Sequence, residues 1–194
     1  HTVRIWNLLM DAGQGLGLTA CGLAARDSLR AGAVLPLSHQ DIGHWTYLHH
    51  PWPFALPFNH TGDGFGKSFL GSAALDKAHD APYTLTFVGN DLRKIDAHQA
   101  VVRDLQGREI GTVLTCATDM AIGRHDGRIY SVASPNKPDG LVIKGLCAGF
   151  IKVEANLAPG TIVELKDSMR SIKVVIETDV RPDRTARKAL KSFV

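Results

Sequence analysis

The clearest structural signal in the sequence is the stretch AVVRDLQGREIGTVLTCA, residues 100–117. Apolar and polar residues alternate on both sides of Gln106-Gly107, a pair that is typical of a tight turn. The stretch therefore predicts a β-hairpin whose strands are Ala100–Asp104 and Glu109–Ala117.

Other extended segments surround this hairpin from residue 80 onward. They are Tyr83–Val88, Gly127–Val132, Leu141–Lys152, Thr161–Lys166 and Ser171–Thr178. Strands that recur about every dozen residues and are joined by turns are typical of a small antiparallel barrel or sandwich. We expect such a β-domain over residues 80–194, with the basic segment 181–194 as a solvated end.

Residues 1–79 have a different texture, rich in Gly, Pro, His and Trp, and they contain helical pieces. The spacing of apolar residues predicts a helix over Val3–Asp11 that stops at Gly13, and a short helix over Phe69–Ala78 after a cap near Ser68. A third helix, over 23–33, would turn Leu23, Leu29 and Ala33 inward. The fold class is therefore α+β, with a boundary between residues 79 and 80.

Composition limits the kinds of partner. The chain has 194 residues, of which 44% are hydrophobic and 21% charged, and its net charge of +3 is too mild to indicate a nucleic-acid partner. We find no apolar run that would span a membrane and no signal peptide, so we expect no membrane partner. Three widely spaced cysteines (Cys21, Cys116 and Cys147) are typical of reduced thiols in a cytoplasmic protein.

Two patterns in the first half partly match cofactor-binding motifs, namely a dinucleotide-binding loop and a metal site, but both lack a feature that the motif requires. The glycines of Gly13-Gln14-Gly15-Leu16-Gly17 follow a helix, whereas a dinucleotide loop follows a strand. Five histidines fall between residues 39 and 60, but no pair has metal-ligand spacing; they are His39, His44, His49, His50 and His60. We interpret this segment as a polar, aromatic loop that lines a cleft, and we predict no metal; a metal-dependent hydrolase is the less favoured alternative.

Arg26 and Arg30 lie four residues apart, on one face of the expected helix. An arginine there can bind a ligand carboxylate through two parallel hydrogen bonds. The alternative is an ordinary surface helix with a weak Asp27–Arg30 ion pair. From spacing alone the surface helix is favoured, and the residues reveal no catalytic set.

Five blocks, in order, resemble the aminomethyltransferase (T-protein) of the glycine cleavage system and its folate-dependent relatives. The first, CGLAARDSLRAG at 21–32, is similar to the family's C-G-L-G-A-R-D-x-L-R-x-E-A-G. The others are Leu35–Leu37 with Gln40–Ile42 (L-x-L-Y-G-x-D-I), GKSFLGSAAL at 66–75 (K-x-D-F-I-G-K-E-A-L), GREIGTVLT at 107–115 (G-x-x-I-G-x-V-T-S) and Pro159–Thr161 (x-P-G-T). Together they span nearly the whole chain.

The resemblance implies the C-terminal part of a folate-binding α+β body at 1–79, followed by an antiparallel, jelly-roll-like β-barrel domain at 80–194. It implies transfer of a one-carbon unit between a small-molecule methyl donor and tetrahydrofolate, with Arg26 at the folate site. The family's acidic residue would lie upstream, in a remaining N-terminal half, so the catalytic residue is unknown. This also accounts for a chain that begins at His1, inside a helical pattern, and we expect such a fragment to be inactive alone.

Departures from the family pattern favour a relative that acts on a different methyl donor. Asp96 stands where the family has an arginine, so either Arg93 or Lys94 makes the arginine's contact or the contact is absent, and Ala31 replaces an acid. Residues 43–58 have become aromatic, which makes Trp45, Tyr47 and Trp52 candidates for a substrate pocket. The alternatives are that these rings only pack the loop against the barrel, and that the protein is a non-catalytic binding or assembly module of a larger enzyme.

Overall fold

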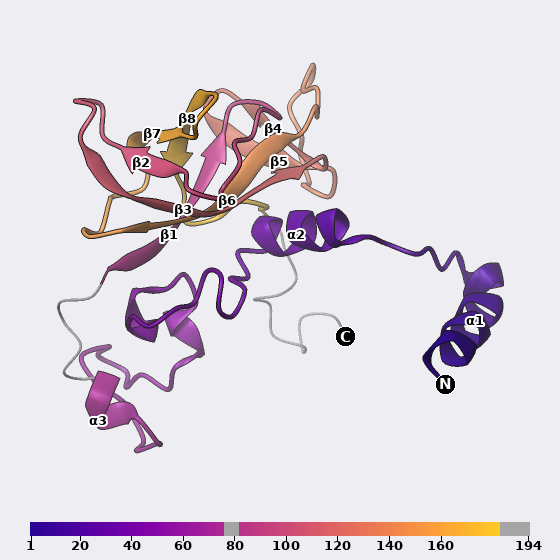
Figure 1. Ribbon diagram of the computed structural model, residues 1–194, viewed down its shortest axis with the longest axis horizontal. Coiled ribbons are helices and arrows are strands. Elements are labelled where there is room, and N and C mark those ends of the chain that lie inside the picture. Colours follow the sequence, from indigo (N-terminus) through magenta and orange to yellow (C-terminus); the bar gives the residue numbers. More distant parts are fainter. Residues whose placement is uncertain (76–81, 183–194) are drawn as a thin grey trace.

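The computed structural model describes residues 1–75 and 82–182, and its main feature is a closed barrel (Figure 1). Six antiparallel strands follow one another around the barrel in the order β1-β6-β3-β2-β7-β8, and β8 returns to β1. Their bounds are β1 Tyr83–Gly89, β2 Val101–Arg103, β3 Glu109–Asp119, β6 Leu146–Val153, β7 Ile162–Lys166 and β8 Ser171–Ile176. The predicted fold class is confirmed.

The hairpin of residues 100–117 forms as predicted, since β2 pairs with β3 and Gly107 takes a positive φ in the turn. One strand escaped prediction. This strand, β4 (Ile122–His125), pairs with β5 (Arg128–Ser131) in a separate two-stranded sheet that projects beside the barrel (Figure 1). Its four residues include Gly, Arg and His, so no apolar alternation marks it.

Apolar residues on the two faces of the barrel wall build two cores. The interior core contains Phe87, Val102, Ile151, Leu165 and Val174. The second core lies between the outer wall and helix α2 (Leu23–Gly32), and its members include Ala31, Val34, Ala117, Ala148 and Phe150. Helix α2 is thereby held against β3 and β6.

A β-bulge in β3 sets the direction of its side chains next to α2. Val113 pairs with Ile151 but Thr115 pairs with Phe150, so the register shifts at Leu114. After the bulge, Thr115 and Ala117 face α2, while Cys116 packs with the interior core. Bulges commonly re-aim side chains in this way.

The inward face predicted for α2 is wrong. Leu23 and Leu29 are 76% and 58% exposed, and the buried residues are Arg30, Ala31 and Gly32. The helix approaches the barrel closely at its C-terminal end, where a Cβ on residue 32 would collide with the Asp119 carboxylate. Small side chains and one paired arginine therefore occupy the contact, and the larger leucines face outward.

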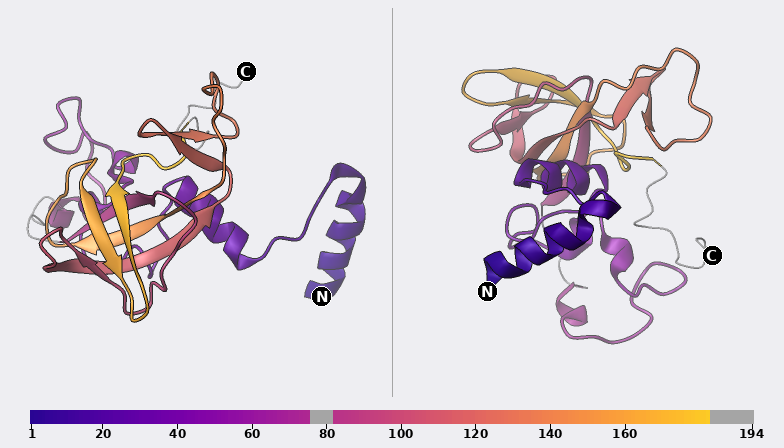
Figure 2. Two further views of the ribbon diagram at one scale, coloured as in Figure 1. Left: turned by 90° about the horizontal axis from the view of Figure 1, so that it is seen from above. Right: turned by 90° about the vertical axis from the view of Figure 1, so that its right-hand side faces the viewer.

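The remaining helical pieces are short, except α1. They are α1 Thr2–Gly13, η1 Gln14–Leu16, η2 Tyr47–His49, η3 Pro53–Ala55 and α3 Ser72–Leu75. Helix α1 lies apart from the barrel, as Figure 1 and the left view of Figure 2 show, and several of its apolar side chains are exposed. Helix α3 begins at Ser72, after the positive φ of Gly71, and not near Ser68; residues 76–78 of the expected helix lie outside the described residues.

Arg181, at the start of the basic end, is not a solvated residue. Its guanidinium holds the Asp119 carboxylate through two hydrogen bonds of 2.5 and 3.0 Å, and its backbone N–H donates to the carbonyl of Gly32. The rest of that segment, 183–194, lies outside the described residues, and the proposed boundary at 79/80 also falls in an undescribed stretch. No helix within residues 1–75 and 82–182 has the length and apolar character needed to cross a membrane.

Candidate functional site

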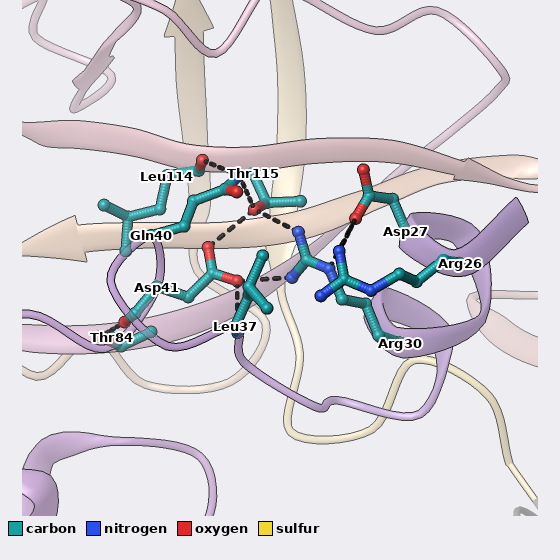
Figure 3. A network of polar contacts seen from close by, with 9 residues as sticks. All are labelled: Arg26, Asp27, Arg30, Leu37, Gln40, Asp41, Thr84, Leu114 and Thr115. Atoms are coloured by element: carbon teal, nitrogen blue, oxygen red, sulfur yellow. Dashed lines mark hydrogen bonds and ion pairs between the residues drawn. The ribbon is translucent and has the colours of Figure 1, made fainter. Parts of the chain in front are cut away.

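A buried polar network joins helix α2, the loop after it and strand β3 (Figure 3). Asp41 is fully buried, and its Oδ2 accepts a hydrogen bond of 2.5 Å from Arg30 Nη1. Its Oδ1 accepts from the hydroxyl of Thr115 at 2.7 Å, and that hydroxyl oxygen accepts from Arg30 Nη2 at 3.0 Å. These three side chains form a closed triangle in which the two buried charges neutralise each other.

Neighbouring groups complete the hydrogen bonding of Asp41. The backbone N–H of Leu37 donates to the carboxylate at 2.9 Å, and the Thr84 hydroxyl donates to the Asp41 carbonyl at 3.1 Å. Gln40 donates both to the Thr115 hydroxyl and to the carbonyl of Leu114, at the bulge. The loop that carries Asp41 is therefore fixed to β1 and β3.

The two arginines of α2 have different environments, which the sequence alone did not distinguish. Arg30 is buried and bonded to Asp27, Asp41 and Thr115. The side chain of Arg26 is 51% exposed, and among the described residues its one ion pair is a 3.9 Å contact with Asp27. The guanidinium of Arg30 thus uses its hydrogen bonds within the protein, while most of the hydrogen-bond donors of Arg26 face solvent.

A cavity of about 420 Å³ opens beside this network. Its charged lining contains two acids, Asp27 and Asp96, and two bases, Lys94 and Arg170. The other lining residues are Gln40, Ile95, Ala97, Thr115, Cys116 and Ala117. The cavity therefore offers both hydrogen-bond acceptors and cationic donors to a polar ligand.

The two basic residues that precede Asp96 lie in different places. Lys94 lines the cavity, whereas Arg93 lines a different one and pairs with Asp91 at 2.8 Å. Arg170 was not anticipated from the sequence. It lies at the β7–β8 turn, far from residue 94 in the chain, and its Nη1 donates to the carbonyl of Lys94 at 3.1 Å.

The aromatic candidates lie on the other side of the loop. Trp45 donates through Nε1 to Thr84 Oγ1 at 3.0 Å, its ring stacks on His50 at 5.6 Å, and the ammonium of Lys152 lies 5.4 Å from it. This contact with β1 and β6 agrees with a packing role for Trp45. The 420 Å³ cavity is not lined by Trp45, Tyr47 or Trp52, so their role as a substrate pocket stays a prediction.

The histidines do not assemble into a metal centre in the described part of the chain, where no three His, Cys, Asp or Glu side chains are grouped to hold an ion. His50 is buried between Trp45 and Tyr47, and neither ring nitrogen has a hydrogen-bond partner. Burial, together with the charge of His49, lowers the pKa of His50 to about 4. His50 is therefore a neutral core residue at physiological pH.

Comparisons with known proteins agree with the motifs. No protein-family model matches the sequence. The aminomethyltransferase of Bacillus licheniformis is 30% identical over 189 residues, 97% of this chain and 42% of that protein. The aminomethyltransferase of Bacillus subtilis is 32% identical over 126 residues, 64% of this chain and 34% of that protein. The chain thus spans about two fifths or less of the length of these relatives.

The fold of the chain also occurs in a solved structure. A crystal structure of the glycine cleavage system aminomethyltransferase T from Bartonella henselae superposes with a TM-score of 0.58, at 21% identity, over 91% of this chain and 42% of that one. The structure therefore defines an α+β protein with the barrel architecture found in that neighbour. The chain is a relative of the aminomethyltransferase superfamily, as its motifs indicated.

Proposed function

We propose that this chain forms part of the folate site of a one-carbon transferase, which moves a methyl or methylene unit between a small-molecule donor and tetrahydrofolate. The observation that carries the proposal is the half-exposed guanidinium of Arg26, in the motif block that resembles the family's folate-site arginine. Its helix neighbour Asp27 lines the 420 Å³ cavity.

The side chains present are suited to a folate. A folate carries carboxylates on its glutamate tail, and an arginine with free donors binds a carboxylate through paired, charge-assisted hydrogen bonds. Its pterin has ring N–H groups, and the carboxylates of Asp27 and Asp96 would accept hydrogen bonds from them. Lys94 and Arg170 supply further positive charge beside the cavity. Tetrahydrofolate, when bound, supplies the nitrogen atoms that carry the one-carbon unit.

The residues of this chain act by positioning. The Arg30–Asp41–Thr115 triangle fixes α2 on the barrel, so that the backbone of Arg26 is held still while its side chain reaches outward. Rigid placement of reacting groups lowers a barrier without a protein nucleophile. No residue here matches the family's acidic position, so we assign proton transfer to another part of the whole protein. Three free cysteines support a cytoplasmic location for it.

A second candidate function is a non-catalytic binding or assembly module. The observation that favours it is Asp96, which lines the cavity and stands where the resemblance to the family implies an arginine. The two functions differ in turnover. The full-length gene product is incubated with tetrahydrofolate and a panel of N-, S- and O-methylated donors, and methylated or methylene folate is measured by mass spectrometry.

The transferase function would be supported by transfer from any donor, provided that Arg26→Ala reduces the rate of transfer and Arg108→Ala leaves it unchanged. Arg108 is a suitable control because it is an exposed arginine whose ion-pair partner within the described residues is the nearby Asp104. Folate binding without transfer from any donor would support the module, and absence of folate binding would contradict both.

A further inference from the structure

One irregular segment of the barrel supplies much of the wall of the 420 Å³ cavity. Residues 94–97 lie between β1 and β2, belong to no strand, and all four line the cavity. Ile95 is 3% exposed and belongs to the interior core, whereas Lys94 and Asp96 on either side of it are exposed. Because the segment lies outside the strand pairing of the barrel, its backbone depends on other groups for its hydrogen bonds.

The turn between β7 and β8, residues 167–170, provides two such groups. Asp167 Oδ2 accepts a hydrogen bond of 2.9 Å from the backbone N–H of Asp96. Arg170 Nη1 donates a hydrogen bond of 3.1 Å to the backbone carbonyl of Lys94. The two bonds therefore attach the turn to the segment on both sides of Ile95, and we call this pair of bonds the turn clip.

The Asp167 side chain is itself fixed within the turn. Its second oxygen, Oδ1, accepts hydrogen bonds from the backbone N–H groups of Met169 at 2.8 Å and Arg170 at 2.7 Å. Together with the N–H of Asp96, these groups lower the pKa of the Asp167 carboxyl, which is therefore ionised at neutral pH. Asp167 is not one of the residues that line the 420 Å³ cavity, so its effect on a ligand there passes through residues 94–97.

We propose that Asp167 is a positioning residue of the candidate folate site. Through the N–H of Asp96 it fixes the segment that carries the Lys94 ammonium and the Asp96 carboxylate, so that both charged groups are in place before the ligand binds. A site that is already ordered loses less conformational entropy when it binds its ligand. The inference rests on the proposed function, since folate is the ligand that these groups would contact.

Replacement of Asp167 by asparagine separates the turn from the turn clip. The amide oxygen still accepts the N–H groups of Met169 and Arg170, as asparagine does in turns, but the NH₂ group then faces the N–H of Asp96, donor against donor. The opposite orientation of the amide would set NH₂ against two N–H groups. The clip therefore loses a bond while the turn keeps its own.

Asp104→Asn is the matched control. Asp104 Oδ1 accepts hydrogen bonds of 2.9 Å from the backbone N–H groups of Gln106 and Arg108 in the turn between β2 and β3. The residue thus has the same role within its turn, and it is not among the residues that line the cavity. We expect both variants to keep the urea midpoint of the wild type to a similar degree, because both keep an acceptor for the turn.

The direction of the change in folate affinity distinguishes positioning from charge. Asp167→Asn removes a negative charge close to a cavity that would bind an anionic ligand, so electrostatics alone predicts tighter binding. Loss of the turn clip predicts weaker binding. We expect calorimetry on the full-length gene product to give a tetrahydrofolate dissociation constant raised roughly threefold to tenfold in Asp167→Asn, and the wild-type value in Asp104→Asn.

Hydrogen exchange provides a readout that needs no folate. In the free full-length protein, the peptide that contains residues 94–97 should exchange its amide hydrogens roughly fivefold faster in Asp167→Asn than in the wild type and Asp104→Asn. Unchanged exchange would contradict the turn clip, and wild-type or tighter folate binding by Asp167→Asn would contradict the positioning role alone. Absence of folate binding by the wild type would contradict the proposed function and this role with it.

Discussion

Replacement of Asp41 by asparagine removes the charge at the centre of the buried network while it keeps the shape of the side chain. The carboxylate accepts hydrogen bonds from Arg30, the Leu37 N–H and the Thr115 hydroxyl. An amide supplies one oxygen and one donor NH₂ group, so at least one of these three donors then faces another donor. Arg30 keeps only the half-buried Asp27 as an ionic partner.

The size of the effect follows from the burial of the pair. Removal of one partner from a buried ion pair costs about 3–5 kcal/mol, because the other charge stays buried without compensation. Asp27 still neutralises part of the Arg30 charge, so we expect Asp41→Asn to lower the free energy of unfolding by about 3 kcal/mol. Arg30→Met with Asp41→Asn should cost less than the sum of the single changes, with a coupling energy of at least about 1 kcal/mol.

Urea unfolding followed by tryptophan fluorescence measures this free energy, since Trp45 is bonded to Thr84 beside the network. Arg108→Ala is the matched control, because an exposed ion pair contributes about 0–1 kcal/mol. A loss below about 1 kcal/mol for Asp41→Asn, or additive single and double changes, would refute the argument that α2 is fixed on the barrel by this network.

Three further results are expected. Burial lowers the pKa of His50 from 6.5 to about 4, so between these pH values the unfolded chain binds more protons than the folded chain. The free energy of unfolding should therefore fall as the pH drops from 6.5 to 4, by up to about 3 kcal/mol. His50→Phe should flatten this part of the pH profile in thermal unfolding, and an unchanged slope would show that His50 is not the source of the pH dependence. Gly32→Ala places a Cβ against the Asp119 carboxylate and should lower the urea midpoint by an amount equivalent to about 1–3 kcal/mol; a wild-type midpoint would contradict the close approach of α2. Lys94→Ala and Arg170→Ala should each weaken tetrahydrofolate binding several-fold, and the loss of affinity should be larger at low salt than at high salt. If calorimetry finds the same loss at both salt concentrations, the ammonium of Lys94 and the guanidinium of Arg170 do not attract the ligand by their charge.

The barrel was predictable because its signals are local. The hairpin at 100–117 combines alternation with a glycine turn, and both depend only on neighbouring residues. Strand β4 was missed because its polar residues carry no alternation. The inward face of α2 was missed because it depends on how closely the helix approaches β3, which periodicity does not contain.

The site was only partly predictable for the same reason. The motif identified the arginine pair, but the separate roles of Arg26 and Arg30 depend on Asp41 and Thr115, which the fold brings from distant parts of the chain. Arg170 reaches the cavity through the β7–β8 turn, and no pattern in the sequence links it to residue 94. Long-range contacts of this kind require the three-dimensional structure.

The central claim is that Arg26 binds a folate carboxylate, and one titration tests it. Tetrahydrofolate is added to the full-length gene product, to Arg26→Ala and to Arg108→Ala, and the dissociation constants are measured by calorimetry under reducing conditions. Loss of a charge-assisted arginine–carboxylate contact should weaken binding by roughly tenfold to a hundredfold in Arg26→Ala and leave Arg108→Ala at the wild-type value. Equal affinity of Arg26→Ala and the wild type, or no binding by any of the three, would contradict the claim.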